Sequence, residues 1–312
     1  MQRDRATSIV AVVAILLVLS GGSVRAKTFG PWSAPVNAES IAGTSSDFNT
    51  PFTDGCPILA PDGLTLYMAS NRPGGFGGLD IWAAHRDEVG DPWRSPSNLG
   101  ADINTSADEF CPSPTRGRRL FFVSTRAGGC GGADIYRTRR DEDAWRAPVN
   151  LGCDINGPGG EASPSYFRDD AGREVLYFSS VRPGGFAPDV GVVDSDIYAS
   201  FDWGPAQLVP GLNTAAEDTR PNVRHDGREV VFDSTRPGTL GGPDIWTATR
   251  PTEGSGWNAP IHLDAPVNSA ASDTRASLSW DGTTMVFGST RPGSELAPDG
   301  VTVSSDIYVT SR

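Results

Sequence analysis

Five acidic residues recur in this sequence, each placed behind an asparagine in the pattern Asn-x4-Asp/Glu. The first copy runs from Asn49 to Asp54. The acids of the five copies are Asp54, Glu109, Glu161, Asp218 and Asp273. If they gather in a ring, they offer oxygen ligands to a cation, or an acid and a nucleophile for a glycosidic bond.

Five arginines match these acids in number and recur in a Ser-x-Arg pattern. They are Arg72, Arg126, Arg182, Arg236 and Arg291. A closed set of arginine–carboxylate pairs joining the repeats is the structural interpretation of the acid ring. We prefer it, because a catalytic centre gives its members different jobs and so breaks the symmetry that these patterns keep.

The symmetry of the repeats is broken in two long loops, at 185–195 and 294–305. Their acidic residues are Asp189, Asp194, Glu295 and Asp299. Binding residues tend to lie on loops that a rigid scaffold holds, so we expect a partner to bind here, although simple drift of an inserted segment explains the loops as well. Asp189, Asp194 and Asp196 are crowded enough to hold calcium, but their spacing fits no established loop, and we expect no cofactor and no metal.

The period of the repeats indicates the architecture that positions these residues. The Ser-x-Arg copies are 54 to 56 residues apart, which is room for four short strands. Each copy contains an aromatic and branched run before Ser-x-Arg, a glycine-rich loop, and a strand that opens with Asp-Ile-Trp or Asp-Ile-Tyr. A fourth strand carries a tryptophan with a proline close behind it, as at Trp93 and Pro96.

A unit of this size cannot bury both of its faces, so the copies must pack around an axis. We predict an all-β, five-bladed β-propeller of four-stranded blades, with repeat cores near 52–99, 107–151, 159–212, 216–263 and 271–312. The last copy lacks its tryptophan, and the missing one is Trp32 near the N-terminus. Residues 29–42 are therefore expected to supply the outer strand of the last blade and close the ring.

These motifs resemble the WD40-like propeller repeats of the TolB type, in which Pro-Asp-Gly turns, Phe-x-Ser-x-Arg strands and Asp-Ile-Tyr strands follow one another. The resemblance covers residues 52–312. This chain departs from TolB itself in having five longer units instead of six shorter ones and in lacking its separate N-terminal domain. The resemblance implies a bacterial envelope or secreted propeller that binds other macromolecules and seldom catalyses.

The cysteines and the N-terminus indicate export. Residues 1–26 combine arginines, a short apolar run and small residues near position 26, which is typical of a cleaved signal peptide. The run is too short to span a bilayer. The protein is therefore expected in the periplasm or the medium, with residues 27–312 as one domain.

The cysteines are even in number, so disulfides are favoured over free thiols and over zinc. Cys130 and Cys153 fall on one face of neighbouring blades, whereas Cys56 and Cys111 occupy equivalent positions two residues after a ring acid. We expect Cys130 to pair with Cys153 and Cys56 with Cys111.

Charge and motifs restrict the function. The formal charge is −12, which argues against nucleic acid as a partner. The sequence has no Gly-x-Ser-x-Gly elbow and no His-Glu-x-x-His motif. We expect an exported, monomeric, non-catalytic propeller that binds a protein on its loop face; the alternative is a carbohydrate-binding or glycoside-hydrolysing propeller that uses the axial carboxylates.

Overall fold

The computed structural model describes residues 29–142, 144–186 and 194–312. The chain divides into two units, residues 1–30 and residues 31–312, and everything below concerns the second. The expected signal peptide lies outside the described residues. In the part that is described, no helix is long and apolar enough to cross a membrane.

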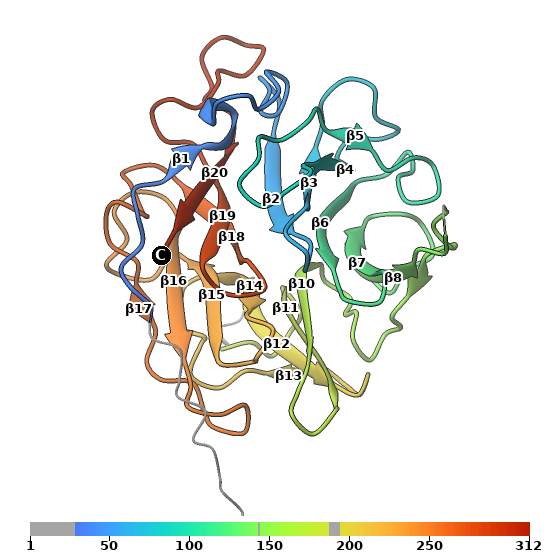
Figure 1. Cartoon of the computed structure of the whole chain (residues 1–312). Helices are drawn as coiled ribbons and strands as arrows, with labels where there is room; N and C mark the ends of the chain where they lie inside the picture. The colour runs from blue at the N-terminus through green and yellow to red at the C-terminus, as the bar shows by residue number, and fades with distance from the viewer. Residues whose placement is uncertain (1–28, 143, 187–193) are drawn as a thin grey trace, which may run out of the picture. The chain divides into compact units, whose positions relative to one another are not determined.

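The second unit consists of five antiparallel sheets of four strands each, the blades of a β-propeller (Figure 1). Blade 1 contains β2 (Asp54–Leu59), β3 (Thr65–Ser70), β4 (Asp80–His85) and β5 (Ser97–Asn98). Blade 2 contains β6 (Glu109–Pro114), β7 (Arg119–Ser124), β8 (Asp134–Arg139) and β9 (Val149–Asn150). Blade 3 contains β10 (Glu161–Arg168), β11 (Glu174–Ser180), β12 (Asp196–Phe201) and β13 (Gln207–Leu208). Blade 4 contains β14 (Asp218–Val223), β15 (Glu229–Ser234), β16 (Asp244–Thr249) and β17 (Ile261–His262).

Blade 5 combines the two ends of the unit and closes the ring. It contains β18 (Asp273–Leu278), β19 (Thr284–Ser289), β20 (Asp306–Ser311) and β1 (Val36–Asn37), which a short 3-10 helix, η1 (Ala38–Ser40), follows. Val36 pairs with Val309 and Asn37 with Tyr308. The predicted five-bladed fold and its closure by the N-terminal segment are confirmed.

The outer strands differ from the prediction, because the tryptophans lie before them. In blade 1 the fourth strand, β5, has two residues and begins after Trp93 and Pro96. A proline has no N–H to give to a ladder and is confined to strand ends and edges. The tryptophan and the proline therefore belong to the connection that leads to each outer strand.

The register of each blade brings the three sequence motifs to one level. Asp54 pairs with Ser70, and Ser70 pairs with Asp80. The same alignment of first-strand acid, second-strand serine and third-strand aspartate recurs in the other blades. The Asn-x4-acid, Ser-x-Arg and Asp-Ile motifs are therefore parts of one structural unit.

Every inner strand contains a β-bulge two residues after its acid. The register shifts there in all five blades. The bulge residues have positive φ: Cys56 (46°), Cys111 (47°), Ser163 (49°), Arg220 (54°) and Arg275 (58°). Such angles are uncommon for residues other than glycine, and bulges are used to re-aim side chains next to functional sites.

The hydrophobic core lies between the blades and is built from the aromatic and branched residues of the second and third strands. Phe121, Phe122, Phe178, Phe232 and Phe287 are fully buried. Clusters of these residues span neighbouring blades. This packing holds the inner strands, and with them the bulges, in fixed positions.

Candidate functional site

Each ring acid is bound to the Ser-x-Arg arginine of its own blade. Arg72 contacts Asp54 at 2.5 Å, Arg126 contacts Glu109 at 3.2 Å, Arg182 contacts Glu161 at 3.1 Å and Arg291 contacts Asp273 at 2.5 Å. Arg236 pairs with Asp218 in the same way. The serine two residues before the arginine accepts a hydrogen bond from its Nε.

The asparagine of each motif fastens one blade to the next. Asn104 Oδ1 accepts a hydrogen bond from the backbone N–H of Ile81 in blade 1, and its Nδ2 donates to the Ile81 carbonyl. Arg126 of blade 2 donates to the carbonyl of Ile103, the residue before this asparagine. Equivalent bonds join Asn49, Asn156, Asn213 and Asn268 to the isoleucine of the preceding blade. The Asn-x4-acid pattern is thus a joint between blades.

The five ring acids are closed off from solvent. They are at most 1% exposed, and none of them lines the axial pocket. The bulge that follows each acid turns the next side chains toward the axis and leaves the acid inside the joint. A glycosidase needs two carboxyl groups that reach its substrate, and these five do not have that access in this structure.

Three of the four acids of the two long loops lie among the described residues. Asp189 lies outside the described residues, and Asp194 is half-buried beside Asp196. Asp299 is exposed, and hydrogen bonds from the Thr302 hydroxyl and from the backbone N–H groups of Val301 and Thr302 lower the pKa of its carboxyl group. Glu295 donates its backbone N–H to Asp306. In the described part of the chain, no three acids, histidines or cysteines group closely enough to hold a metal ion.

Both expected cysteine pairs are present as disulfides. Cys130 is bonded to Cys153 and Cys56 to Cys111. The first pair joins the glycine-rich loop of blade 2 to the segment that precedes blade 3. The second joins two bulges directly across neighbouring blades. Disulfides persist in proteins that are exported to oxidising compartments.

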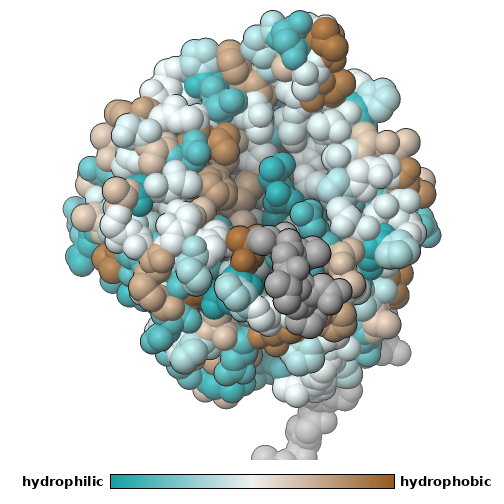
Figure 2. Space-filling model, turned by 180° about the vertical axis from the view of Figure 1, so that it is seen from behind, coloured by the Kyte–Doolittle hydropathy of each residue, from teal (hydrophilic) through white to brown (hydrophobic). Residues whose placement is uncertain are grey.

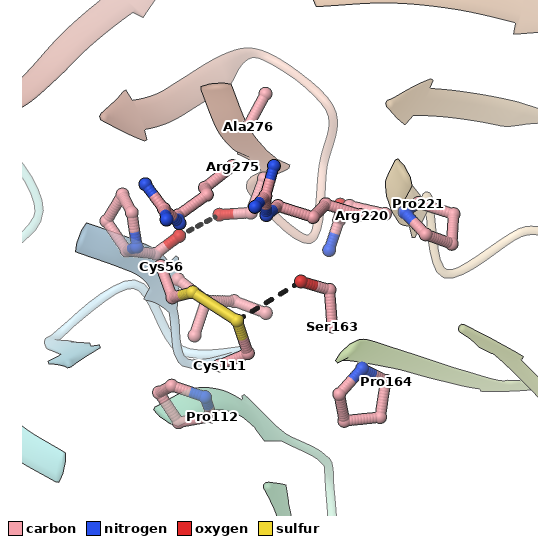
Figure 3. Close-up of a pocket in the computed structure, with 13 residues that line it drawn as sticks. Cys56, Cys111, Pro112, Ser163, Pro164, Arg220, Pro221, Arg275 and Ala276 are labelled. Atoms are coloured by element: carbon pink, nitrogen blue, oxygen red, sulfur yellow. Dashed lines mark hydrogen bonds between the residues drawn. A yellow bond between two sulfur atoms is a disulfide. The ribbon is translucent and has the colours of Figure 1, made fainter. Parts of the chain in front are cut away.

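The bulge residues line a small pocket at the propeller axis (Figure 3). Blades 1 and 2 contribute the Cys56–Cys111 disulfide, blade 3 contributes Ser163, and blades 4 and 5 contribute Arg220 and Arg275. The hydroxyl of Ser163 lies 3.2 Å from the Cys111 sulfur. The pocket encloses about 30 Å³, which is enough for roughly two water-sized groups. Whereas every blade has an acid at the ring position, the residue at the bulge position differs between blades.

The two axial arginines share one buried carboxylate. Asp233 on β15 accepts a hydrogen bond from Arg220 Nη1 at 3.1 Å, and its two oxygens accept the backbone N–H of Arg275 at 2.8 and 2.9 Å. Burial raises the pKa of Asp233, and the two arginines oppose this rise. The guanidinium of Arg220 thus pairs with Asp233, whereas Arg275 reaches the same carboxylate through its backbone N–H.

The guanidinium of Arg275 keeps most of its donors unused among the described residues. Its side chain donates one hydrogen bond there, from Nη1 to Thr274 Oγ1 at 3.5 Å. Burial and the neighbouring charge of Arg220 lower the pKa of Arg275 to about 10, so the group stays positive at neutral pH. An anion in the pocket would accept these donors and relieve the repulsion between the arginines.

Gly55 provides the room that Arg275 occupies. A Cβ on Gly55 would lie 3.5 Å from Arg275 Cδ and 3.7 Å from Nη1. The aliphatic stem of Arg275 therefore crosses the backbone of blade 1, next to the bulge at Cys56. A larger residue at position 55 would push the guanidinium out of place.

Arg220, Arg275 and Asp233 were not predicted from the sequence. Cys56 and Cys111 both stand two residues after a ring acid, and the equivalent position in blades 3 to 5 carries the signal for Arg220 and Arg275. An alignment of the five copies at that position gives Cys, Cys, Ser, Arg and Arg. Asp233 had no such signal, because only the folded sheet brings β15 against β18.

One face of the molecule is hollowed near its centre, and hydrophilic residues gather in the hollow (Figure 2). A polar hollow of this kind suits a ligand that makes hydrogen bonds.

Comparison with solved structures shows the fold. A thermostable family-43 glycoside hydrolase is 13% identical and matches with a TM-score of 0.55 over 86% of this chain and 91% of its own. A GH43_12 from a capybara gut metagenome is 14% identical, with a TM-score of 0.58 over 88% of this chain and 55% of its own. The α-L-arabinofuranosidase of Lactobacillus brevis is 13% identical, with a TM-score of 0.52 over 85% and 93%.

TolB structures also match, with TM-scores of 0.44 and 0.46. No protein-family model matches the chain, and no curated protein is significantly similar to it in sequence.

These matches correct the expected function. The resemblance to TolB repeats led us to expect a non-catalytic protein-interaction module. Structures that match with TM-scores above 0.5 include several that are glycoside hydrolases by name, which contradicts that expectation. The matches do not show a protein partner.

Proposed function

We propose that this protein is a carbohydrate-binding propeller that holds an acidic sugar at its axis. The observation that carries the proposal is the pair of arginines that line the axial pocket: Arg220 is paired with Asp233, and the guanidinium of Arg275 pairs with no carboxylate among the described residues. The likeness of the fold to glycoside hydrolases supports a sugar as the ligand, and the arginines specify its charge.

The chemistry of the pocket suits a carboxylate better than a neutral hydroxyl. Guanidinium groups bind carboxylates through short, charge-assisted and often bidentate hydrogen bonds. The pocket has room for about two oxygen-sized groups, so the acid group would enter it while the sugar ring stays outside. The Ser163 hydroxyl is a further donor or acceptor on the same wall.

Binding is proposed here, and cleavage is left to measurement. Among the described residues that line the axial pocket, none is an aspartate or a glutamate. A glycosidic bond above the arginines therefore has no carboxyl pair beside it in this structure. Release of reducing ends, followed in the same samples as binding, reports whether cleavage accompanies binding.

The test is calorimetric titration of the protein with digalacturonate and with its methyl ester, which keeps the sugar and the linkage but lacks the charge. We expect the acid to bind and the ester to bind at least 10-fold more weakly. Arg220→Gln and Arg275→Gln should each weaken the axial site by roughly 10- to 100-fold, the worth of a hydrogen bond to a charged group. Arg146→Gln is the control, because Arg146 is exposed and pairs with the exposed Asp141.

Equal binding of the acid and its ester would overturn the recognition of charge. Absence of any binding by either sugar would overturn the proposed function itself.

A further inference from the structure

A cleft between blades 1 and 2 lies at the opposite end of the inner strands from the ring acids. Its walls are the hairpin after β2, the hairpin after β6 and the loop after β8, and its volume is about 610 Å³. This volume is within the range of small-molecule sites. None of its residues lines the axial pocket.

Three arginines of this cleft have guanidinium N–H groups that could donate hydrogen bonds to a ligand. The side chains of Arg118 and Arg140 make no hydrogen bond or ion pair within the described parts of the chain, and both residues are exposed. Arg116 stacks on Trp280, with its guanidinium carbon 4.3 Å from the ring centroid, which fixes its position without using its N–H groups. Arg119 differs, because it is tied to Glu174 at 3.0 Å.

The backbone at Arg118 is held in a conformation that glycine or asparagine adopts more easily. Gly117 has a φ of 86° and Arg118 a φ of 62°, so two consecutive residues of this hairpin have positive φ. A long side chain at such a position carries a conformational cost. Arg118 therefore lines the cleft in a backbone conformation that lowers the stability of the hairpin.

Aromatic and acidic residues complete the cleft. Tyr67 and Trp145 are half-buried in its wall, and the Arg140 guanidinium lies 5.9 Å from the Trp145 ring centroid. Asp62 and Glu142 also line it, and Asp62 already accepts the backbone N–H of Leu64. The three arginines outnumber these two acids, and the aromatic surfaces offer flat apolar contact to a sugar ring.

We infer that this cleft is a second binding site, for an acidic oligosaccharide whose carboxylates are held by Arg116, Arg118 and Arg140 and whose rings lie against Tyr67 and Trp145. The choice of a sugar rests on the proposed function, whereas the preference for an anion rests on the cleft alone. With the axial site, the protein would then bind two such ligands.

The test is the stoichiometry of digalacturonate binding to the full chain. We expect two sites in the wild type, one site in the double variant Arg118→Gln/Arg140→Gln, and one site in Arg220→Gln. Arg119→Gln is not a suitable control, because it breaks the bond to Glu174; Arg146→Gln serves instead and should keep both sites. Circular dichroism verifies that each variant is folded.

The outcomes separate this inference from the proposed function. One site in the wild type that only Arg220→Gln removes would overturn the cleft and leave the axial site standing. One site that only the double variant removes would support the cleft and overturn the axial proposal. If inorganic sulfate competes at the cleft as tightly as digalacturonate binds, the anion preference holds but the assignment of a sugar there is wrong.

Discussion

Asp233 accepts the backbone N–H of Arg275 with both oxygens of its carboxylate, at 2.8 and 2.9 Å. The bond crosses from the second strand of blade 4 to the first strand of blade 5. It holds the bulge at Arg275 in its positive-φ conformation and places a negative charge directly behind the axial pocket. The geometry of the joint and the charge of the pocket therefore depend on one side chain.

Replacing Asp233 by asparagine should destabilise the protein and strengthen its affinity for anions. The carboxylate is fully buried, and removing one partner of a buried ion pair costs about 3–5 kcal/mol. Urea unfolding measures the loss of stability, and sulfate should restore part of it by taking the place of the missing charge. Asp141→Asn, in an exposed pair, is expected to leave stability nearly unchanged. A wild-type unfolding curve for Asp233→Asn would show that the shared carboxylate is unimportant.

Substitutions at Gly55 should separate the position of Arg275 from the stability of the fold. Alanine is expected to leave binding unchanged, because its Cβ would make ordinary contacts of 3.5 to 3.8 Å with Arg275. Leucine would displace the guanidinium and should weaken digalacturonate binding at the axis by at least 10-fold. The measurement is calorimetric titration of both variants, with thermal melts as the check on folding. Tight axial binding by Gly55→Leu would contradict the assigned role of Arg275.

Asp196 should make stability depend on pH in an unusual direction. Burial raises its pKa to about 6, and Leu208 stands where blade 2 has Asn150, which donates to the equivalent Asp134. The folded protein therefore binds more protons than the unfolded chain between about pH 4 and pH 6, and its stability falls as the pH rises through this range.

Asp196→Asn, and independently Leu208→Asn, should flatten that fall. The midpoint of urea unfolding, followed from pH 4.5 to pH 7.5, measures it. Asp306, whose pKa is also raised to about 6, contributes a similar fall that both variants retain, so the flattening is partial. An unaltered pH profile in both variants would refute the role of Asp196.

Deleting residues 27–42 should lower the melting temperature sharply. The deletion removes β1 and exposes the edge of β20, and it also removes the bond between the Ser33 N–H and the Ser311 carbonyl. We expect a decrease of more than about 10 °C, since a loss of 1 kcal/mol shifts the melting temperature of a protein this large by roughly 2–4 °C. A protein lacking only residues 1–26 is the control, and equal melting of the two would refute the closure.

The sequence predicted the fold because the physical causes of the fold repeat in it. The Ser-x-Arg and Asp-Ile motifs mark the same two strand positions in each copy, and the displaced Trp32 indicates how the ring closes. The outer strands were misplaced because two residues of pairing leave almost no pattern, whereas Trp93 and its equivalents are prominent and lie in the connection.

The site was harder to predict because side-chain direction depends on the bulges. Simple alternation along β18 does not show that Asp273 turns into the joint while Arg275 turns to the axis. The extra residue of the bulge decides this, and its positive φ is visible only in the folded backbone. Asp233 was beyond prediction for a different reason, since its partners are far away in the sequence and meet it only across two blades.

Each of the five bulges places one side chain at the axis from the same backbone conformation. In this protein the five residues are Cys56, Cys111, Ser163, Arg220 and Arg275. The joints made by the asparagines, acids and Ser-x-Arg arginines recur in all five blades, so Ser163 can be exchanged without breaking them. Cys56 and Cys111 have to be exchanged together because they form a disulfide, and Arg220 also pairs with the buried Asp233. The residues that would set ligand preference are thus different from the residues that join the blades, and the axial pocket can be redesigned within the same fold.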